Sequence, residues 1–543
     1  MTQRHWLASY GEVPADINPD AYPSVVALAE DAMARYAGKT AFVGAGQALS
    51  YADIDALSRD FCAWLQSVGV IKGDRVAVML PNIMAFPVAF LGIARAGAVQ
   101  VNVNPLYTPR ELEHQLVDSG SEAIVIYADA LPTLAGILAK TPVKRVIVAP
   151  RPGAGDALGR GSEVPATIEG SVGFNDALAA GARLERQPVQ LAGDDLLFLQ
   201  YTGGTTGPSK GAALSHRNLV ANTEQFKAFM RVATRPGEET IVTAIPLYHI
   251  FALMVNFITY FSVGAENWLV PNPRDGEAFV GVLERARPTV FMGVNTLYAG
   301  LTQHPRLGQL DWSRLRLAGG GGAAVIRTVS DRWKSLTGVF IREGYGLSET
   351  SPVLSFNPVY INEFTGTTGL PLPSTDIKLL GDEDEEVPVG QPGEICAKGP
   401  QVMGGYWQKP EANAAAFTDD GYFRTGDVGV FDAKGFLKIV DRKKDMIIVS
   451  GFNVYPNEVE EVATACPGVA ECACIGVPDE KTGEAVRLFV VKAPGASVDE
   501  AQLIAHCRAA MAAYKVPKTV TFVDALPKST VGKILRRDLR TLA

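Results

Sequence analysis

The sequence YTGGTTGPSKG (201–211) is the strongest local signal in the chain. It follows the apolar run DLLFLQ (195–200), which predicts a strand that leads into a loop. Its glycines let backbone N–H groups turn toward an anion, and its hydroxyls and Lys210 add donors and a positive charge. The loop is not a Walker A motif, because Ser209 stands before the lysine and Gly211 after it. A flexible Gly/Ser/Thr linker is the alternative, but the pattern favours a loop that holds phosphate oxygens.

Strands and helices alternate along the chain before this loop. The runs RVAVML (75–80), AIVIY (123–127) and RVIVA (145–149) are short and apolar, so each predicts a buried strand. MAFPVAFLGIARAGA (84–98) predicts a helix after the first of them. This alternation predicts a parallel sheet covered by helices on both faces. The Gly- and Pro-rich segment 150–170 predicts a surface loop.

The texture of the sequence changes from about residue 362. GEICAKG (393–399), GYFRTGD (421–427) and GFLKIVDRKKDMIIVSG (435–451) predict short strands with glycine turns. They indicate a small β-rich subdomain over about 362–440.

The C-terminal part of the chain predicts a compact α+β unit. PNEVEEVATACPG (456–468) has Pro near its start and predicts a helix. CACIGVPD and RLFVVKAP predict strands, and KSTVGKILRRDLR (528–540) predicts a basic helical end.

A chain of 543 residues is too long for a single hydrophobic core. The predicted fold class is α/β, with a large N-terminal domain, residues 1–440, that combines βαβ-type layered sheets with the small β-rich subdomain. A small α+β domain, residues 441–543, follows it.

Bulk composition excludes several classes of protein. Hydrophobic residues make up 47% and charged residues 20% of the chain, as in soluble globular proteins, and the net charge of −8 argues against nucleic-acid binding. Six cysteines are too few for a disulfide framework, and residues 1–20 lack an apolar signal core, so a cytoplasmic location is expected. The apolar stretches 79–103 and 244–265 contain Pro and polar residues, so no transmembrane helix is predicted. Peripheral contact with the inner face of the membrane stays open.

Further motifs follow the phosphate loop in a fixed order. AGGGGA (318–323) lets backbone approach a flat ligand closely. EGYGLSET (343–350) offers an aromatic face, hydroxyls and a carboxylate able to hold Mg²⁺. FRTGD (423–427) offers a carboxylate for sugar hydroxyls. The remaining motifs are DRKKD (441–445), SGFNVYP (450–456) and PKSTVGK (527–533).

The ordered set of motifs resembles the adenylate-forming superfamily of acyl-CoA synthetases, peptide-synthetase adenylation domains and luciferases. The resemblance covers nearly the whole chain and is strongest to bacterial long-chain fatty acid–CoA ligases. It implies that a carboxylate and ATP give acyl-AMP and pyrophosphate, after which the thiol of coenzyme A gives acyl-CoA and AMP. The stretches that carry the closer resemblance are PLYHIFAL (246–253), GVNTLY (293–298), VDRKKDMIIVSGFNVYPNEVE (440–460) and PKSTVGKILRRDLR (527–540).

The resemblance implies a nucleotide site in which Tyr345 packs on adenine and Ser348 contacts phosphate or carboxylate. Asp427 would bind the ribose hydroxyls with help from Arg442. The full implied ATP site comprises Thr202, Gly203, Gly204, Thr205, Thr206, Gly207, Lys210, Gly320, Gly321, Gly322, Ala323, Gly344, Tyr345, Gly346, Ser348, Asp427, Ile439, Arg442 and Lys533.

Four residues are implied to be catalytic: Lys533, Glu349, Thr205 and His249. Lys533 would contact the substrate carboxylate and phosphate during adenylation, while Glu349 and Thr205 would hold Mg²⁺. Taken alone, Lys533 is a typical surface lysine, Glu349 a helix-start carboxylate and His249 a satisfied core histidine. The surrounding motifs favour the functional roles of the first two.

Acyl and CoA sites are implied as well. The acyl pocket would be lined by His249, Gly293, Val294, Gly320 and Gly322. The three glycines are small and would leave room for a long chain. The CoA site would contain Lys444, Gly451, Phe452 and Asn453. A thiol must reach the acyl carbon where Lys533 had been, so the resemblance implies a domain swing about a hinge at 441–444.

Several alternatives stay open at this point. An acyl- or aryl-CoA ligase for a shorter or aromatic acid differs only in pocket shape. An acyl-AMP ligase that loads a carrier protein would stop short of the CoA thioester, and a nucleotide-binding regulator would bind ATP without releasing pyrophosphate. The expected partners are a fatty acid, ATP and CoA without nucleic acid, and a homodimer is an expectation by analogy alone.

Overall fold

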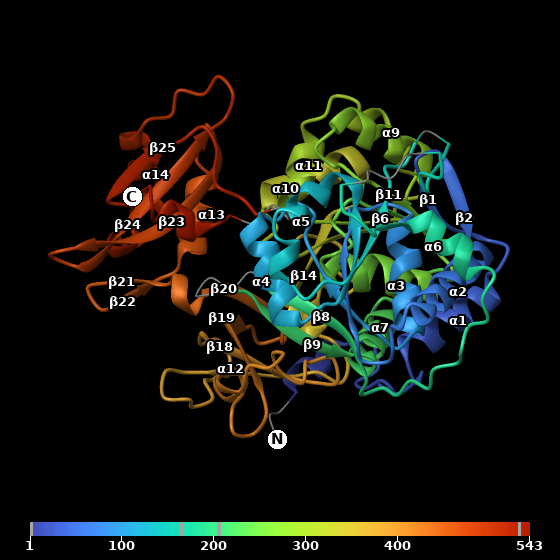
Figure 1. The fold of residues 1–543 in the computed structure, drawn as a ribbon. Helices are drawn as coiled ribbons and strands as arrows, with labels where there is room; N and C mark the ends of the chain where they lie inside the picture. The colour runs from blue at the N-terminus through green and yellow to red at the C-terminus, as the bar shows by residue number, and fades with distance from the viewer. Residues whose placement is uncertain (1–3, 154, 162–166, 203–207, 530–533, 543) are drawn as a thin grey trace.

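Two large β-sheets form the N-terminal part of the molecule (Figure 1). The computed structural model describes residues 4–153, 155–161, 167–202, 208–529 and 534–542. The first sheet has the strand order β7 (Val172–Gly173), β6 (Arg145–Ala149), β5 (Ala123–Tyr127), β3 (Arg75–Met79), β4 (Val99–Asn102), β8 (Leu196–Thr202) and β9 (Lys210–Ser215). Its strands are parallel except at the β8–β9 hairpin.

The second sheet is also parallel through its centre, with antiparallel pairs at both ends. Its strand order is β16 (Leu370–Pro371), β15 (Val353–Phe356), β14 (Ile341–Gly346), β13 (Leu317–Gly320), β12 (Val290–Gly293), β10 (Thr240–Thr243), β11 (Glu266–Leu269), β1 (Thr40–Gly44) and β2 (Gln47–Ser50). The predicted buried parallel strands are therefore confirmed.

Helices cover these sheets and fill the space between them. They are α1 (Val25–Arg35), α2 (Tyr51–Ser67), α3 (Ala85–Arg95), α4 (Pro109–Ser119), α5 (Leu131–Ala135), α6 (Phe174–Gly181), α7 (His216–Phe229), a π-helix (Ala252–Thr259), α8 (Tyr260–Ser262), α9 (Gly276–Ala286), α10 (Asn295–Thr302), α11 (Arg327–Thr337) and α12 (Pro410–Ala416). Among the described residues, no helix is both long enough and apolar enough to cross a membrane.

A chain of aromatic rings joins the two sheets through this shared core. Phe90 of α3 stacks on Phe198 of β8, with ring centroids 5.3 Å apart, and meets Phe257 of the π-helix at 5.4 Å. Phe257 in turn contacts Phe42 of β1 at 5.0 Å. Every residue of α3 is buried, which agrees with a sequence that is apolar on all faces. The apolar stretches 79–103 and 244–265 are thus core elements.

Helix α4, which contacts the phosphate hairpin through His114, is capped at both ends. The Thr108 side chain accepts the Glu111 N–H, and the Glu111 carboxylate accepts the Thr108 N–H in return. The helix ends at Gly120, which adopts a left-handed conformation with φ +64°. Such fixed ends hold the side chains of α4 at a defined place.

A four-stranded antiparallel sheet follows, with the order β17 (Asp376–Leu380), β18 (Gly393–Lys398), β19 (Phe423–Phe431) and β20 (Leu437–Arg442). It is the predicted β-rich subdomain, but it begins later than residue 362. The reason is that β15 and β16 pair with β14 and so extend the nine-stranded sheet.

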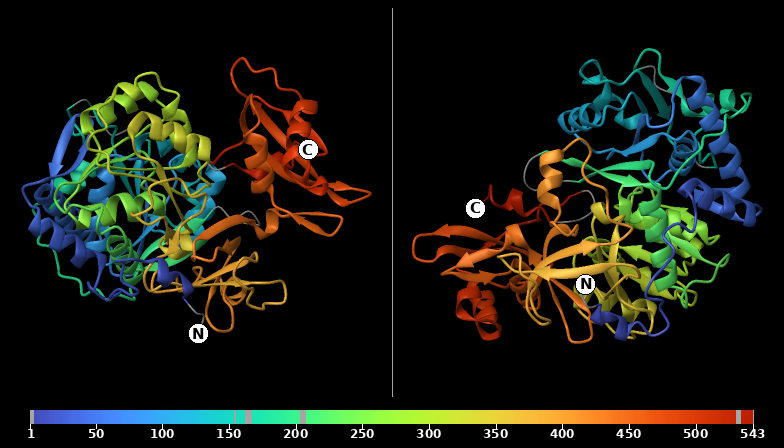
Figure 2. Two further views of the ribbon diagram at one scale, coloured as in Figure 1. Left: turned by 180° about the vertical axis from the view of Figure 1, so that it is seen from behind. Right: turned by 90° about the horizontal axis from the view of Figure 1, so that it is seen from below.

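The C-terminal unit forms its own core around one sheet of five strands. Its elements are β21 (Ile447–Val449), β22 (Phe452–Val454), α13 (Pro456–Thr464), β23 (Val469–Asp479), β24 (Gly483–Lys492), α14 (Glu500–Ala510), β25 (Thr519–Phe522) and α15 (Arg536–Leu539). In both views of Figure 2 this unit lies beside the four-stranded sheet and on the side of the molecule away from α1 and α2. All six cysteines are buried and unpaired, as expected for small core residues.

The predicted helix over 528–540 is wrong for most of the described part. Only Arg536–Leu539 is helical. Lys528 and Ile534 instead form an antiparallel bridge, and the Leu535 N–H donates to the Pro527 carbonyl at 2.9 Å. These pairings use backbone groups that a continuous helix would need. Residues 530–533 lie outside the described residues.

Candidate active site

The predicted phosphate loop connects β8 to β9. Thr202 ends β8 and lies opposite Lys210, the first residue of β9. His114 of α4 contacts the end of the loop just before β9, with its Nε2 2.9 Å from the Ser209 carbonyl oxygen. The predicted ligands Gly203, Gly204, Thr205, Thr206 and Gly207 lie outside the described residues.

A tyrosine that the sequence analysis did not select links this hairpin to the candidate metal ligand. The Nζ of Lys210 lies 5.1 Å from the centroid of the Tyr406 ring, a cation–π distance. The Tyr406 hydroxyl donates to Glu349 Oε1 at 2.8 Å. Backbone pairing fixes Tyr406 in place, because the Trp407 N–H donates to the Gly211 carbonyl at 2.8 Å. The signal in the sequence was an aromatic pair after Gly404 and Gly405, which resembles an ordinary turn.

Glu349 is a buried carboxylate at the centre of the site. It lies in a short 3₁₀ helix, Ser348–Thr350, together with the predicted phosphate contact Ser348. Burial raises the pKa of the Glu349 carboxyl above its ordinary value, and nearby Asp427 raises it further. No Lys, Arg or His nitrogen of the described chain lies within 4 Å of it. A cation bound here would remove the electrostatic cost of this ionised group.

The donor set at Glu349 fits Mg²⁺. This ion typically takes one or two protein carboxylates and completes its shell with phosphate oxygens and water. Among the described residues, no group of three or more His, Cys, Asp or Glu side chains could hold a metal by itself. A magnesium ion at Glu349 would therefore depend on oxygens from a nucleotide.

The predicted ribose and adenine residues come together from three strands. Tyr345 lies on β14 and donates its hydroxyl proton to Asp427 Oδ2 at 2.7 Å. Asp427 on β19 lies opposite Arg442 on β20, and Arg442 Nε is 3.5 Å from Asp427 Oδ1. Ile439 lies half-buried on the same strand, β20. Tyr345, Asp427 and Arg442 thus meet where the nine-stranded sheet approaches the four-stranded sheet.

The glycine-rich segment after β13 packs tightly against the neighbouring strands. Gly320 lies opposite Gly293 of β12, and the Gly321 N–H donates to the Gly293 carbonyl at 3.3 Å. A Cβ at Gly321 would lie 3.3 Å from the Gly344 carbonyl oxygen. These predicted residues are therefore adjacent, and Gly322, with φ +75°, turns the segment away from the sheet. Ala323 follows Gly322 and is half-buried.

Two glycines of the predicted acyl pocket are explained by packing. A Cβ at Gly293 would lie 2.8 Å from the Tyr298 ring, and a Cβ at Gly320 would lie 2.5 Å from the Val325 side chain. At both glycines, the space that a Cβ would take is thus already occupied by another side chain of the protein. The lack of a side chain at these two positions therefore does not by itself open space for an acyl chain. Gly346 has a similar packing role, because a Cβ there would lie 1.9 Å from the Pro352 carbonyl oxygen.

His249 lies in a turn between the phosphate hairpin and the glycine segment. Its Nδ1 accepts the Phe251 N–H at 3.3 Å. The Phe251 ring would be 3.6 Å from a Cβ at Gly321, and Gln200 of β8 donates to the Tyr248 carbonyl at 3.1 Å. This turn therefore lies next to the region of the predicted acyl site, where Val294 also approaches within 3.8 Å of a Cβ at Gly322.

Glu343, the first residue of the EGYGLSET motif, is a second buried acid of the site. It lies on β14 opposite Gly320, and its Oε1 accepts the Val325 N–H at 3.2 Å. Burial raises the pKa of Glu343 to about 8. The carboxyl group therefore fixes the backbone at Val325, just after the glycine-rich segment 318–323.

Three of the four predicted CoA residues lie apart from the nucleotide residues, whereas Lys444 is close enough to Arg442 and Asp427 for their charges to act on it. Gly451, Phe452 and Asn453 are exposed on the turn between β21 and β22, which points away from the two large sheets (Figure 1). Phe452 is 57% exposed and stacks on Tyr514 with ring centroids 4.9 Å apart. Lys444 is exposed in the short turn after β20, and Lys533 lies outside the described residues.

The buried Glu349 and the Tyr345–Asp427–Arg442 cluster lie in the N-terminal part of a chain with a separate C-terminal unit, the arrangement expected for an adenylate-forming enzyme. The family model described as "AMP-binding enzyme" matches residues 29–407, and the model for the "AMP-binding enzyme C-terminal domain" matches residues 458–533. This chain belongs to the AMP-binding enzyme family.

Similar proteins cover the chain almost end to end. A long-chain-fatty-acid–CoA ligase of Escherichia coli O6:H1 is 49% identical over 98% of this chain and 97% of its own length. The structure of the anthranilate CoA ligase AuaEII in complex with anthranoyl-AMP has a TM-score of 0.87 at 27% identity, covering 97% of this chain and 99% of its own. MatB of Rhodopseudomonas palustris superposes with a TM-score of 0.84 in its ATP-bound form (32% identity) and 0.75 in its apo form (33%), each covering 96% of this chain and 98% or more of its own. The resemblance and the α/β fold class expected from the sequence are confirmed.

Proposed function

We propose that this chain is an AMP-forming long-chain fatty acid–CoA ligase. The observation that carries the proposal is the connection from Lys210 through Tyr406 to the buried Glu349, in a chain that matches a bacterial ligase of this activity over nearly its full length. A phosphate-loop lysine and a metal-binding carboxylate held by one tyrosine suit a site that binds a nucleoside triphosphate with its metal ion.

The ATP phosphates would lie at the loop 202–210, where backbone N–H groups, hydroxyls and Lys210 supply positive charge. Tyr345 would pack on adenine and Asp427, steadied by Arg442, would bind the ribose. The rest of the nucleotide site would comprise Gly320, Gly321, Gly322, Ala323, Gly344, Gly346, Ser348 and Ile439.

Adenylation brings two anions together, since an acyl carboxylate oxygen attacks the α-phosphorus of ATP and pyrophosphate leaves. The reaction depends on positioning and on charge neutralisation. Lys210 would act on the triphosphate, and Lys533 would act between the carboxylate and the α-phosphate. Magnesium bound by Glu349 and Thr205 would supply Lewis acidity and neutralise charge on the phosphates.

The acyl chain would extend past the turn that carries His249 and past Val294. Because Gly293 and Gly320 are glycines for reasons of packing, their size does not decide the chain length. Comparison of acids of different length is therefore the direct way to define the substrate.

Thioester formation needs a second arrangement of the molecule. We assign residues 1–440 to the adenylation domain, residues 441–543 to a mobile domain and the pivot to 441–444. The higher TM-score to the ATP-bound form of MatB than to its apo form supports an overall arrangement like that of a nucleotide-bound state. A rotation would bring Lys444, Gly451, Phe452 and Asn453 toward the acyl-AMP. The CoA thiol is itself a good nucleophile and needs no dedicated base.

We also propose that the enzyme is cytoplasmic and forms a homodimer. It would meet its apolar substrate at the inner face of the membrane. The basic residues near the C-terminus give this membrane contact little support, because three of them pair with acidic side chains of the protein. Lys528 pairs with Glu471 at 2.6 Å, Arg540 with Asp445 at 3.1 Å and Arg537 with its neighbour Asp538 at 3.2 Å.

The test measures pyrophosphate release and thioester formation with fatty acids of increasing length and with aromatic acids, each with and without CoA. We expect long-chain acids to give both products, with AMP released only when CoA is present. Pyrophosphate release without any thioester would favour a carrier-loading acyl-AMP ligase, and preference for an aromatic acid would assign the chain to an aryl-CoA ligase. ATP binding without pyrophosphate would leave only a regulatory role.

A further inference from the structure

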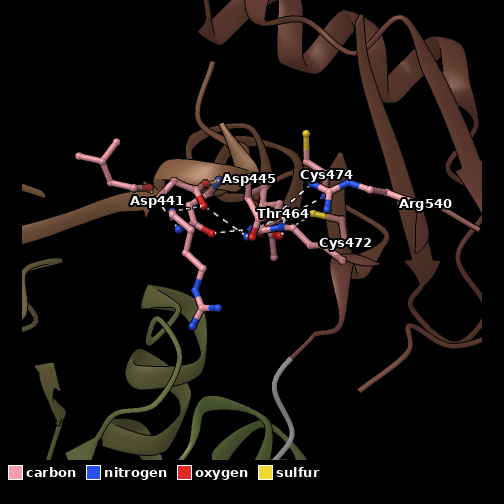
Figure 3. Close-up of polar contacts among 11 residues, drawn as sticks. Asp441, Asp445, Thr464, Cys472, Cys474 and Arg540 are labelled. Carbon is pink, nitrogen blue, oxygen red and sulfur yellow. Dashed lines mark hydrogen bonds and ion pairs between the residues drawn. The ribbon is translucent and has the colours of Figure 1, made fainter. Parts of the chain in front are cut away.

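The end of β20 is where the C-terminal unit touches the rest of the molecule through buried polar groups (Figure 3). Asp441 is the last buried side chain before the turn Lys443–Asp445, and its side chain is 0% exposed. The Asn457 N–H of α13 donates to Asp441 Oδ2 at 2.7 Å, and the Asn457 amide donates to the Val440 carbonyl at 3.1 Å. Elements on the two sides of the proposed pivot therefore meet at this carboxylate.

Arg536 of α15 reaches the same carboxylate from the C-terminal unit. Its Nη1 lies 3.3 Å from Asp441 Oδ1. The other side of the guanidinium is fixed inside the C-terminal unit, because its Nη2 donates to Glu460 at 2.9 Å and to the Asn457 side chain at 2.7 Å. Such a planar fork, held on one side, presents its remaining N–H groups in one direction. Arg536 is therefore a fixed donor aimed at Asp441.

Asp441 is equally well fixed from the other side. It lies on β20, in register with Val428 of β19, and so belongs to the four-stranded sheet. Because β20 extends to Arg442, a rotation in the remaining part of the pivot, at 443–444, would move Arg536 and leave Asp441 in the four-stranded sheet. The Asp441–Arg536 contact therefore exists only in orientations close to the one observed.

Arg536 also lies close in sequence to Lys533, the residue implied to act in adenylation. The strand-like pairs Lys528–Ile534 and Pro527–Leu535 bracket that segment and end immediately before Arg536. The contact with Asp441 thus fixes residues 534–536 relative to the N-terminal domain.

We propose that the Asp441–Arg536 contact is a latch that holds the adenylate-forming orientation, so that its release controls passage to the thioester-forming step. The latch rests on the proposed function, since it assumes two half-reactions in two orientations. The exposed β21–β22 turn supports the assignment to the first step, because the predicted CoA residues on it face away from the large sheets. Arg536 and Asp441 act here as positioning residues and touch no reacting atom.

Asp441→Asn separates this role from the stability of the C-terminal unit. The amide keeps an oxygen for the Asn457 N–H but loses the charge that faces Arg536, while the Arg536–Glu460 pair stays intact. Arg537→Gln is the matched control, because it removes a charge from the adjacent position of α15, where the side chain is 57% exposed and pairs with its neighbour Asp538.

The experiment measures acyl-AMP formation and, separately, thioester formation from supplied acyl-AMP and CoA. We expect Asp441→Asn to slow adenylation about tenfold, the usual effect of losing one charged hydrogen bond, while thioester formation stays equal or rises. Arg537→Gln should change neither step. Equal loss in both steps, an unchanged ratio of the two, or the same shift in the control would overturn the latch.

A second readout does not depend on catalysis. Dyes placed at Lys144→Cys and Lys481→Cys, two exposed positions in the two parts, report their separation by energy transfer, since all six native cysteines are buried. Asp441→Asn should broaden or shift the transfer distribution, and an unchanged distribution would overturn the latch. If the unsubstituted protein makes no acyl-AMP from any acid, the proposed function fails, and the dyes still decide whether the contact fixes the orientation.

Discussion

Two regions of the molecule hold carboxylates largely away from solvent, and they differ in whether an arginine lies beside those carboxylates. Beside the nucleotide residues, Glu343 and Glu349 have no Lys, Arg or His nitrogen of the described chain within 4 Å. At the end of β20, Asp441 and Glu460 share the guanidinium of Arg536, at 3.3 and 2.9 Å. The carboxyls of the first region lie without a nearby cation, whereas in the second region Arg536 opposes the rise in pKa that burial causes at Asp441 and Glu460.

The difference separates function from architecture. An acid buried without a cation destabilises the folded chain in its ionised form, so a site that keeps one gains something else, such as a place for a metal ion. An acid paired with a fixed arginine contributes to a defined geometry. The predictions below test whether this division holds, from the largest expected effect to the smallest.

Glu343 gives the largest expected effect, and it appears in the pH dependence of stability. Its pKa is about 8 in the folded protein and 4.5 in an exposed carboxyl group, so the folded chain binds more protons than the unfolded chain between these values. Stability conferred by the neutral carboxyl is therefore full at low pH and is lost as pH rises toward 8. Glu343→Gln, which cannot ionise, should gain on the order of 4 kcal/mol relative to the unsubstituted protein between about pH 5 and 8.

Unfolding curves in denaturant at several pH values measure this gain. If the free energy of unfolding changes with pH in the same way for both proteins, the pKa of Glu343 is not raised by the fold. Glu343 would then no longer support the contrast between the two regions.

Glu349→Gln should uncouple activity from stability. The amide keeps the hydrogen bond with Tyr406 but cannot neutralise a magnesium ion, so acyl-AMP formation should fall about 100-fold. Because burial raises the pKa of Glu349, the neutral variant should melt at the same temperature or higher. Pyrophosphate release and thermal unfolding, measured on one preparation, check both halves. A variant that loses activity and stability together would place Glu349 with the structural carboxylates.

Glu460→Gln should show the reverse pattern. Arg536 would lose its strongest partner but keep Asp441, so the C-terminal unit should lose about 2 kcal/mol of stability. The amide oxygen can still accept the Cys474 N–H, which Glu460 now receives at 2.7 Å. Denaturant unfolding followed by hydrogen exchange at β23 and β24 locates the loss. Unchanged protection there would mean that the ion pair stabilises orientation alone.

The sequence predicted the parts of the fold and site that depend on neighbours in the chain. The strands at 75–80, 123–127 and 145–149, the helix at 456–468 and the phosphate hairpin were all recognisable from apolar runs and glycine spacing. The helix over 528–540 was not, because the Lys528–Ile534 pairing is a contact between backbone segments that helical composition does not reveal.

Long-range contacts were the other part that local pattern could not supply. Tyr406 lies 57 residues from Glu349, and nothing in its own surroundings distinguishes it from a turn tyrosine. Gly293 and Gly320 were taken as space for an acyl chain, whereas the side chains of Tyr298 and Val325 occupy the direction in which a Cβ would point. Glycine spacing identifies a close approach, but only the packed structure shows what approaches.

Tyr406→Phe gives the smallest effect and the sharpest test of the nucleotide region. The ring would remain beside Lys210 at the present 5.1 Å, while the hydrogen bond to Glu349 is lost. We expect acyl-AMP formation to fall about tenfold, with a matching rise in the magnesium concentration needed for half-maximal rate. Tyr406→Leu removes the ring as well and should also raise the KM for ATP, because Lys210 loses its platform. If the Phe and Leu variants behave alike, the ring does nothing for Lys210, and the hydroxyl alone joins the phosphate hairpin to the carboxylate.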